Sequence, residues 1–138
     1  MSVDVGKKQL RASFAAHRDA SQALEEEGAS AALLLFYSVE CGLKAVLLDQ
    51  RNLRSTSELQ KDLKSHNLRV LAKVLLLPRS LCEQMVDCAG RRGPGERVDF
   101  GDLHQAWRYG RALEKKSEER AVAVLRELLS WCQQELRA

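Results

Sequence analysis

The chain has 138 residues, of which 45% are hydrophobic and 30% are charged, as in one ordinary soluble domain with a sizeable core. Its formal net charge of +3 is far from that of a histone-like protein, so it permits binding to nucleic acid without arguing for it. The sequence has no signal-peptide pattern, no uninterrupted membrane span and no C-x-x-C pair among its four cysteines. We therefore expect a reduced cytoplasmic protein without metal, cofactor or membrane contact.

The first expected helix covers residues 3–27. Leu10, Phe14 and His17 recur at intervals of four and three, which places them on one face of that helix. Because His17 falls on this apolar face, we interpret it as a core or interface histidine. Gly28 follows as a C-terminal stop, and almost no linker precedes the next helix, so the two helices are expected to be antiparallel neighbours.

The stretch 29–50 is expected to be the central helix, around which the rest of the chain folds. It is continuously apolar over 31–36 and largely apolar beyond, and a helix that is apolar on nearly all sides lies inside a protein. Its polar residues Tyr37, Glu40 and Lys44 follow at spacings of three and four, so they share one face. Because an unpaired buried charge is costly, we expect the rest of the chain to supply partners for Glu40 and Lys44.

The middle of the chain predicts a polar connection and then one or two helices. Ser65 is a plausible N-cap, and the apolar residues that follow it, Leu76 included, have helical spacing. Pro78 ends or kinks this helix, and a further short helix could occupy 78–89.

The segment 90–101 is expected to be a mobile surface loop. It opens with three glycines and a proline, which are typical of turns and loops. Arg91, Arg92 and Arg97 make it the strongest local concentration of positive charge in the sequence. Its simplest interpretation is a basic, solubilising loop.

Two further helices are expected to complete the chain. Asp102 is positioned to cap a helix over 103–115, and Ser117 to cap a last amphipathic helix. No segment alternates well enough to predict a strand. The sequence therefore predicts an all-α protein, an up-and-down antiparallel bundle of four to six helices that forms a single domain over 1–138.

Three pieces of the sequence together resemble the HEPN family of prokaryotic helical bundles. They are FYSVECGLKA at 36–45, HNL at 66–68 and WRY at 107–109, in the order and spacing of that family. The resemblance implies an up-and-down bundle that commonly dimerises. It also implies a setting in toxin–antitoxin, antiviral-defence or nucleotidyltransferase-associated systems, in which some members are metal-independent ribonucleases and many others are not.

The ribonucleases of this family resemble one another in an arginine followed, four to six residues later, by a histidine. The histidine would move a proton at the ribose or leaving oxygen, and the arginine would stabilise charge on the phosphate. Arg97 and His104 fit this spacing, as do Arg11 and His17. The late position of His104 suits the family better, although Val98 stands where a polar residue usually follows the arginine.

A second candidate site is the polar cluster of Tyr37, Glu40, Lys44, His66 and Arg108. Packing of three helices could bring Glu40 within reach of His66 or Arg108, and a charge-assisted network would then satisfy the buried carboxylate. Such a cluster either fixes the register of the helices or lines a pocket for an anion or nucleotide.

Three hypotheses of function follow. In the first, the chain is a non-enzymatic module that forms a homodimer or docks onto a larger, nucleic-acid-acting partner; this predicts an unremarkable His104 and exposed apolar residues. In the second, it is a ribonuclease that binds RNA, with His104 exposed at a dimer cleft and Arg97 pointing at it. In the third, a nucleotide or anion sensor, a pocket between helices reaches Glu40.

Overall fold

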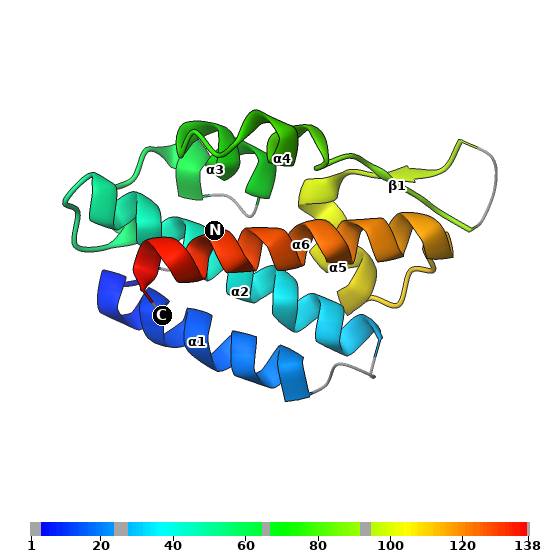
Figure 1. Cartoon of the computed structure of the whole chain (residues 1–138), viewed down its shortest axis with the longest axis horizontal. Helices are drawn as coiled ribbons and strands as arrows, with labels where there is room; N and C mark the ends of the chain where they lie inside the picture. Colours follow the sequence, from blue (N-terminus) through cyan, green and yellow to red (C-terminus); the bar gives the residue numbers. More distant parts are fainter. Residues whose placement is uncertain (1–3, 24–27, 65–66, 92–94, 138) are drawn as a thin grey trace.

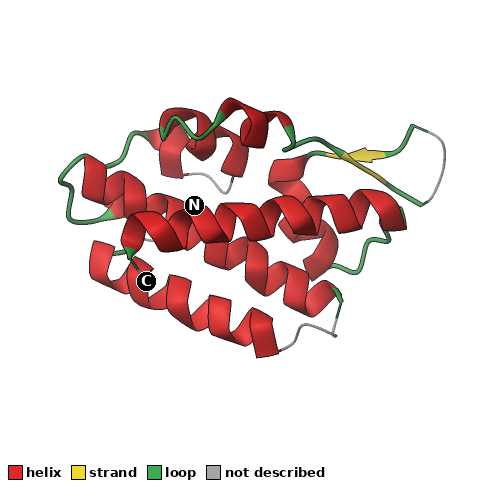
Figure 2. Cartoon of the chain, viewed as in Figure 1, coloured by secondary structure: helices red, strands yellow, loops and turns green. Residues whose placement is uncertain are grey.

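The structure is a computed structural model that describes residues 4–23, 28–64, 67–91 and 95–137. Within these ranges the chain is mainly helical, with one two-stranded sheet, which confirms the all-α class in its general form (Figures 1 and 2). The α-helices are α1 (Lys7–Ala23), α2 (Ala29–Gln50), α3 (Leu68–Val74), α4 (Arg79–Glu83), α5 (Leu103–Arg108) and α6 (Lys115–Leu136). The 3₁₀ helices are η1 (Thr56–Glu58), η2 (Lys61–Lys64) and η3 (Phe100–Asp102), and the strands are β1 (Cys88–Ala89) and β2 (Arg97–Val98).

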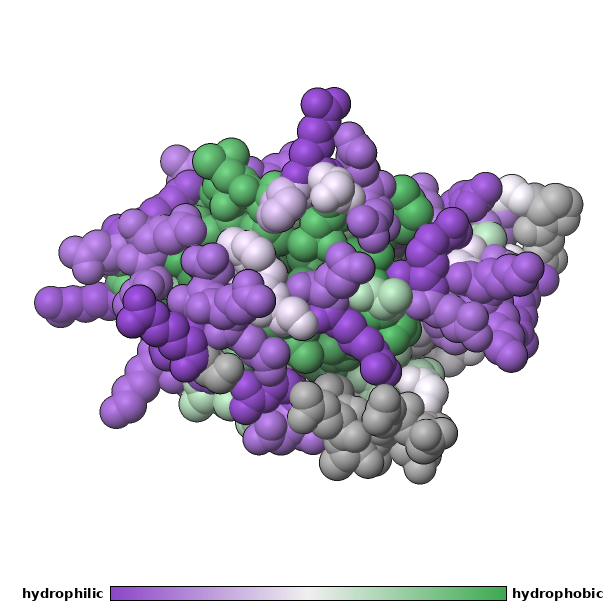
Figure 3. Space-filling view, viewed as in Figure 1, coloured by the Kyte–Doolittle hydropathy of each residue, from purple (hydrophilic) through white to green (hydrophobic). Residues whose placement is uncertain are grey.

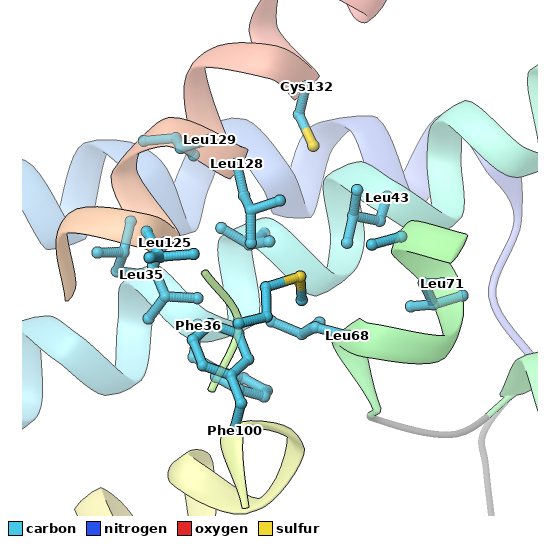
Figure 4. Close-up of a cluster of buried hydrophobic side chains, with 14 of the residues drawn as sticks. Leu35, Phe36, Leu43, Leu68, Leu71, Phe100, Leu125, Leu128, Leu129 and Cys132 are labelled. Atoms are coloured by element: carbon cyan, nitrogen blue, oxygen red, sulfur yellow. The ribbon is translucent and has the colours of Figure 1, made fainter. Parts of the chain in front are cut away.

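Helix α2 lies at the centre of the fold and contacts α1, α3, α5 and α6. Between Leu35 and Leu48 every residue except Tyr37 and Cys41 is buried, which confirms the prediction of a central buried helix. Complete burial of one leucine or phenylalanine side chain contributes about 1.5–3 kcal/mol, so this stretch dominates the core. Figure 4 shows side chains of the neighbouring elements around it, among them Leu68, Leu71, Phe100, Leu125 and Leu128.

Helices α1 and α6 both approach α2 closely at Gly42. A Cβ atom at this position would lie 2.7 Å from Cδ1 of Phe14 and 2.8 Å from Sγ of Cys132. Both separations are shorter than ordinary van der Waals contacts, so the absence of a side chain at Gly42 is what allows the three helices to pack at this distance.

The long helices do not alternate in direction throughout. Helices α1 and α2 are antiparallel neighbours, as predicted, whereas α6 runs in the same direction as α2 (Figure 1). The chain crosses back over the bundle through α3, α4, the hairpin and α5 before α6 begins. The prediction of a uniformly antiparallel, up-and-down bundle is therefore wrong for this pair of helices.

The segment expected to be one basic loop contains regular structure. Strands β1 and β2 form an antiparallel hairpin, in which Cys88 is opposite Val98 and Ala89 is opposite Arg97. An isolated antiparallel bridge also joins Gly90, which follows β1, to Leu113, which precedes α6. The expectations that the chain has no strand and that all of 90–101 is a loop are wrong, because strands of two residues are too short to show an alternating pattern.

Several predicted helices are shorter in the structure than in the sequence analysis. The helix expected over 103–115 ends at Arg108, because Gly110 has a φ of +73° and the chain turns there. Helix α4 covers only part of 78–89, and α1 begins at Lys7 rather than near residue 3. Residues 24–27 lie outside the described residues.

The caps of two helices also differ from those expected. Helix α6 is capped by Glu114, whose carboxylate accepts hydrogen bonds from the backbone N–H groups of Lys116 and Ser117. Ser117 lies inside the helix and is buried, and its hydroxyl donates to Glu114 Oε2 (2.7 Å). Helix α3 is capped by Asn67, whose side chain accepts from Arg69 N; the expected cap Ser65 lies outside the described residues.

Helix α2 is long and apolar enough to cross a membrane, judged by length and composition alone. In the fold, 72% of its most apolar 18-residue window is buried against the rest of the chain. The core helix of a folded domain has the same composition, so this feature follows from the central position of α2.

Candidate functional site

His104 is a buried residue of α5. Its relative exposure is 5%, and its ring centroid lies 5.0 Å from that of Phe36 and 6.4 Å from that of Tyr37. Three other residues of this six-residue helix are buried as well, and the helix packs against α2. The ribonuclease hypothesis required an exposed His104, and that expectation is wrong for the single chain.

The two candidate Arg–His pairs are not joined in the structure. Arg97 lies on β2 and is exposed, and its side chain makes no hydrogen bond or ion pair with any described residue. Arg11 donates from Nη2 to the backbone oxygen of Leu136 (2.8 Å), whereas His17 lies elsewhere on α1 beside Tyr37. The expectation that Arg97 lies in a loop is also wrong, because the hairpin holds its backbone.

An aromatic and basic cluster joins α1, α2 and α5 around Tyr37. The Tyr37 ring lies 6.2 Å from His17 and 6.4 Å from His104, and the Arg108 guanidinium lies 5.4 Å from its centroid. A cation over an aromatic face contributes about 0.5–1 kcal/mol at an exposed site. The Tyr37 hydroxyl is buried and has no hydrogen-bond partner among the described residues. Tyr37 and Arg108 are thus brought together, as the predicted polar cluster required.

Glu40 and Lys44 form a buried ion pair within α2. Their relative exposures are 8% and 7%, and Lys44 Nζ donates to Glu40 Oε2 at 2.9 Å. Of the partners expected from other helices, Arg108 lies over Tyr37, and no ion pair joins it to Glu40 within the described ranges. His66 lies outside the described residues. Among the described residues, the predicted cluster therefore contains an ion pair of Glu40 with Lys44 and a cation–π contact of Arg108 with Tyr37.

Neither Arg91 nor Arg97 of the basic segment forms an ion pair with another described residue. Arg91 is exposed, and its Nε donates to the backbone oxygen of Leu113 (2.8 Å). Glu96, which lies just before β2, forms an ion pair with Arg111 (3.3 Å). Arg92 lies outside the described residues. Of the three arginines predicted for this segment, Arg91 and Arg97 are therefore described and both are at the surface.

The cysteines have the properties of core residues. Burial raises the pKa of Cys41 to about 11, with the Glu40 carboxylate adding to the rise and Lys44 opposing it. Burial also raises the pKa of Cys88 to about 11 and raises that of Cys132. Because the thiolate is the nucleophile and the metal ligand, these thiols are unreactive at neutral pH. Among the described residues, no group of three or more His, Cys, Asp or Glu could hold a metal ion.

An open groove runs between the N-terminal half of α2 and the middle of α6, with a volume of about 860 Å³. We call it the α2–α6 groove, and its lining includes Ala31, Leu35, Val122 and Leu129 as apolar walls and Glu118, Glu119 and Arg126 as charged residues. Glu118 accepts a hydrogen bond from Trp107 Nε1 (3.0 Å). None of the residues of the predicted polar cluster lines this groove, so it is not the pocket that the sensor hypothesis required. Figure 3 shows hydrophobic residues at the surface, among hydrophilic ones, on the face of the molecule that α6 crosses.

Leu76 is a large apolar side chain with a relative exposure of 87%. It lies in the turn between α3 and α4 and has a φ of +56°, a left-handed conformation that costs a non-glycine residue about 1–2 kcal/mol. The N–H of Leu76 bonds to Lys73 O and the N–H of Leu77 to Ala72 O, so the turn ends α3 with the bonding pattern usually completed by glycine. We call Lys73, Leu76, Leu77 and Arg79 the Leu76 turn.

The sequence analysis missed both of these surfaces. It grouped Leu76 with apolar residues of helical spacing, and only the closeness of Pro78, which cannot continue a helix, hinted at a change of direction. The α2–α6 groove depends on how two helices far apart in the sequence pack, and the sequence signals it only through small residues on its lining, such as Ala31 and Ala123.

No family model, no curated protein and no solved structure matches this chain.

Proposed function

We propose that this protein is a HEPN-like helical module of a prokaryotic defence or toxin-type system, which acts in the cytoplasm by protein–protein docking and not by catalysis. It would form a homodimer or bind a larger partner that acts on nucleic acid. The observation that supports the proposal most is the burial of His104 against Phe36, away from Arg97.

The proposal follows from what a catalytic histidine has to do. A general acid or base must come within hydrogen-bond reach of the proton that it moves. A side chain with 5% exposure on the core face of α5 does not reach a ribose hydroxyl. Arg97, the other member of the pair, stands on the hairpin without a contact to His104 among the described residues. Catalysis depends on positioning, and nothing described here positions this pair.

Docking is favoured by the apolar surface that the fold leaves open. Leu76 and Tyr109 have exposures of 87% and 76%, and the α2–α6 groove has apolar walls. Exposed apolar surface of this kind, edged by charged residues, marks interaction sites in soluble proteins.

The first experiment separates docking from catalysis. The purified chain and its His104→Ala variant are incubated with single-stranded RNA in EDTA, and cleavage is followed on a gel. We expect no cleavage by either protein. Cleavage that survives EDTA and is lost in His104→Ala would overturn the proposal in favour of the metal-independent ribonuclease with Arg97 and His104.

The second experiment asks whether the open surface is occupied. A photo-crosslinking amino acid replaces Ala123, which is exposed and lines the α2–α6 groove, and in a control replaces Ala12, which is exposed on α1. Crosslinks made in the source cells are then identified by mass spectrometry. We expect a defined adduct from position 123 and none of comparable yield from position 12.

A further inference from the structure

We infer that this chain associates with copies of itself, and that Leu76 of one copy inserts into the α2–α6 groove of the next. The inference rests on the docking role proposed above and names the occupant of the groove. Three observations support it: a strained exposed leucine, an apolar groove of suitable size, and charges of opposite sign, basic beside the leucine and acidic on the lining of the groove.

The first observation is that the fold holds Leu76 outward at a cost. A residue at φ +56° would be more stable as glycine, and an apolar side chain with 87% exposure gains nothing from the core. The turn next to it has a shallow hollow of about 440 Å³ that also includes Leu77 and Cys82. An exposed apolar knob beside a hollow is the form of an interface anchor.

The second observation is that the α2–α6 groove can receive such a knob. Its volume of about 860 Å³ exceeds that of one leucine side chain, and Ala31, Leu35, Val122 and Leu129 offer apolar walls. Small residues at Ala31 and Ala123 let the partner's backbone come close. Burial of Leu76 there would remove its apolar surface from water.

The third observation is the charge on the two surfaces. Lys73 and Arg79 are exposed on the Leu76 turn, and Glu118 and Glu119 lie on the lining of the groove. Neither Lys73 nor Glu119 makes an ion pair within the described parts of the chain, whereas Arg126, the cation of the groove, has an interaction of its own. We therefore place Lys73 of one copy against Glu119 of the next, because complementary charges fix the orientation of such a contact.

The two surfaces come from different elements, so the contact is heterologous. Two copies could exchange it twice and close as a dimer, or each copy could bind the next in a ring or an open chain. In every case association depends on Leu76 and on the groove together.

The test measures self-association of the full chain by sedimentation velocity and light scattering as the protein concentration rises. We expect the wild type to associate, and Leu76→Gly to associate at least about tenfold more weakly while melting about 3 °C higher. A rise in stability with a loss of association is a result that misfolding does not produce. Val86→Ala is the control, because Val86 is 43% exposed but lines neither surface, and it should associate as the wild type does.

Charge reversal tests the orientation of the contact. Lys73→Glu and Glu119→Lys should each weaken association several-fold, and the double variant should restore it. The inference is overturned if the wild type stays monomeric up to millimolar concentration, if Leu76→Gly associates as the wild type does, or if the double variant fails to recover.

These outcomes separate the inference from the docking role on which it rests. A monomeric chain whose position 123 still crosslinks to a different protein would end the inference and leave docking in place. Cleavage of RNA in EDTA that depends on His104 would end the docking role whatever the oligomeric state.

Discussion

Two runs of three consecutive leucines in this chain differ in backbone conformation and in the exposure of their side chains. In Leu33-Leu34-Leu35 the run continues along α2; Leu35 is buried with 5% exposure, and Leu33 and Leu34 are half-buried. In Leu75-Leu76-Leu77 the outer two residues are buried with exposures of 5% and 6%, while Leu76 between them is 87% exposed. The first run therefore has no exposed leucine, whereas the second run has one side chain that protrudes into solvent.

The difference is set by the backbone. Helix α2 keeps a helical conformation through its run, so none of its three leucines is fully exposed. At Leu76 the chain adopts φ +56° and turns before Pro78, which directs two leucines inward and one outward. Composition decides how much apolar surface a segment has, and backbone conformation decides where that surface goes.

The largest expected effect concerns the buried ion pair of α2. Glu40→Ala removes the carboxylate that accepts from Lys44 Nζ inside the fold, and breaking a buried ion pair costs about 3–5 kcal/mol of unfolding free energy. Urea denaturation measures this change. The matched control is the double variant Glu40→Leu with Lys44→Leu, which should be close to the wild type. A small loss in Glu40→Ala would instead indicate that the pair lines a site open to water or ligand.

The leucine comparison itself is tested next. Leu35→Ala should lower the unfolding free energy by about 2–5 kcal/mol, because it removes buried methyl groups and leaves a cavity. Leu76→Ala should change it by less than about 0.5 kcal/mol, because that side chain is exposed. Equal losses in the two variants, again by urea denaturation, would contradict the assignment of Leu76 to the surface.

Gly42 tests whether the close packing around α2 is required. Gly42→Ala adds a methyl group within 3 Å of Phe14 and Cys132, and overpacking of this kind costs about 1–3 kcal/mol. Thermal unfolding followed by circular dichroism reports the change. Gly95→Ala is not a suitable control because its φ is +86°, whereas Ala12→Gly on the exposed face of α1 reports helix propensity alone. No change in melting temperature would mean that α1 and α6 can move apart freely.

The smallest effect concerns pH. The pKa of Cys41 is raised from 9.0 to about 11 by burial, so between these values the unfolded chain loses a proton that the folded chain keeps. Stability from this group is complete below pH 9 and is lost as the pH rises toward 11, by up to about 1 kcal/mol at pH 10. Urea denaturation at pH 8 and pH 10 should show a smaller loss in Cys41→Ala than in the wild type; an equal loss would show that this thiol does not contribute.

Much of the helical fold could be predicted from the sequence, because the apolar run of α2 indicates a buried helix and the spacing of Leu10 and Phe14 indicates one apolar face of α1. The hairpin could not, since β1 and β2 are each two residues long and are held by backbone hydrogen bonds that side-chain patterns do not record. The parallel course of α2 and α6 also depends on the path taken by 51–114, where short elements leave several routes open.

The candidate site was less predictable than the fold. The pairing of Tyr37 with Arg108 was within reach of the sequence, because both residues were placed on helices expected to pack. The burial of His104 was not predicted from the sequence, although Trp107 follows three residues later and lies on the same buried face of α5. A spacing rule between an arginine and a histidine says nothing about which of them reaches solvent.

The ion pair inside α2 has a consequence during synthesis of the chain. Before the other helices are made, α2 is a 22-residue apolar segment with a mean hydropathy of 1.8 in its most apolar window, the kind of segment that membrane-insertion machinery samples. A charged residue near the middle of such a segment raises the free energy of insertion by about 2.5–3.5 kcal/mol. Glu40 and Lys44, which the finished fold conceals, therefore oppose the entry of the nascent helix into a bilayer and keep it available for the core.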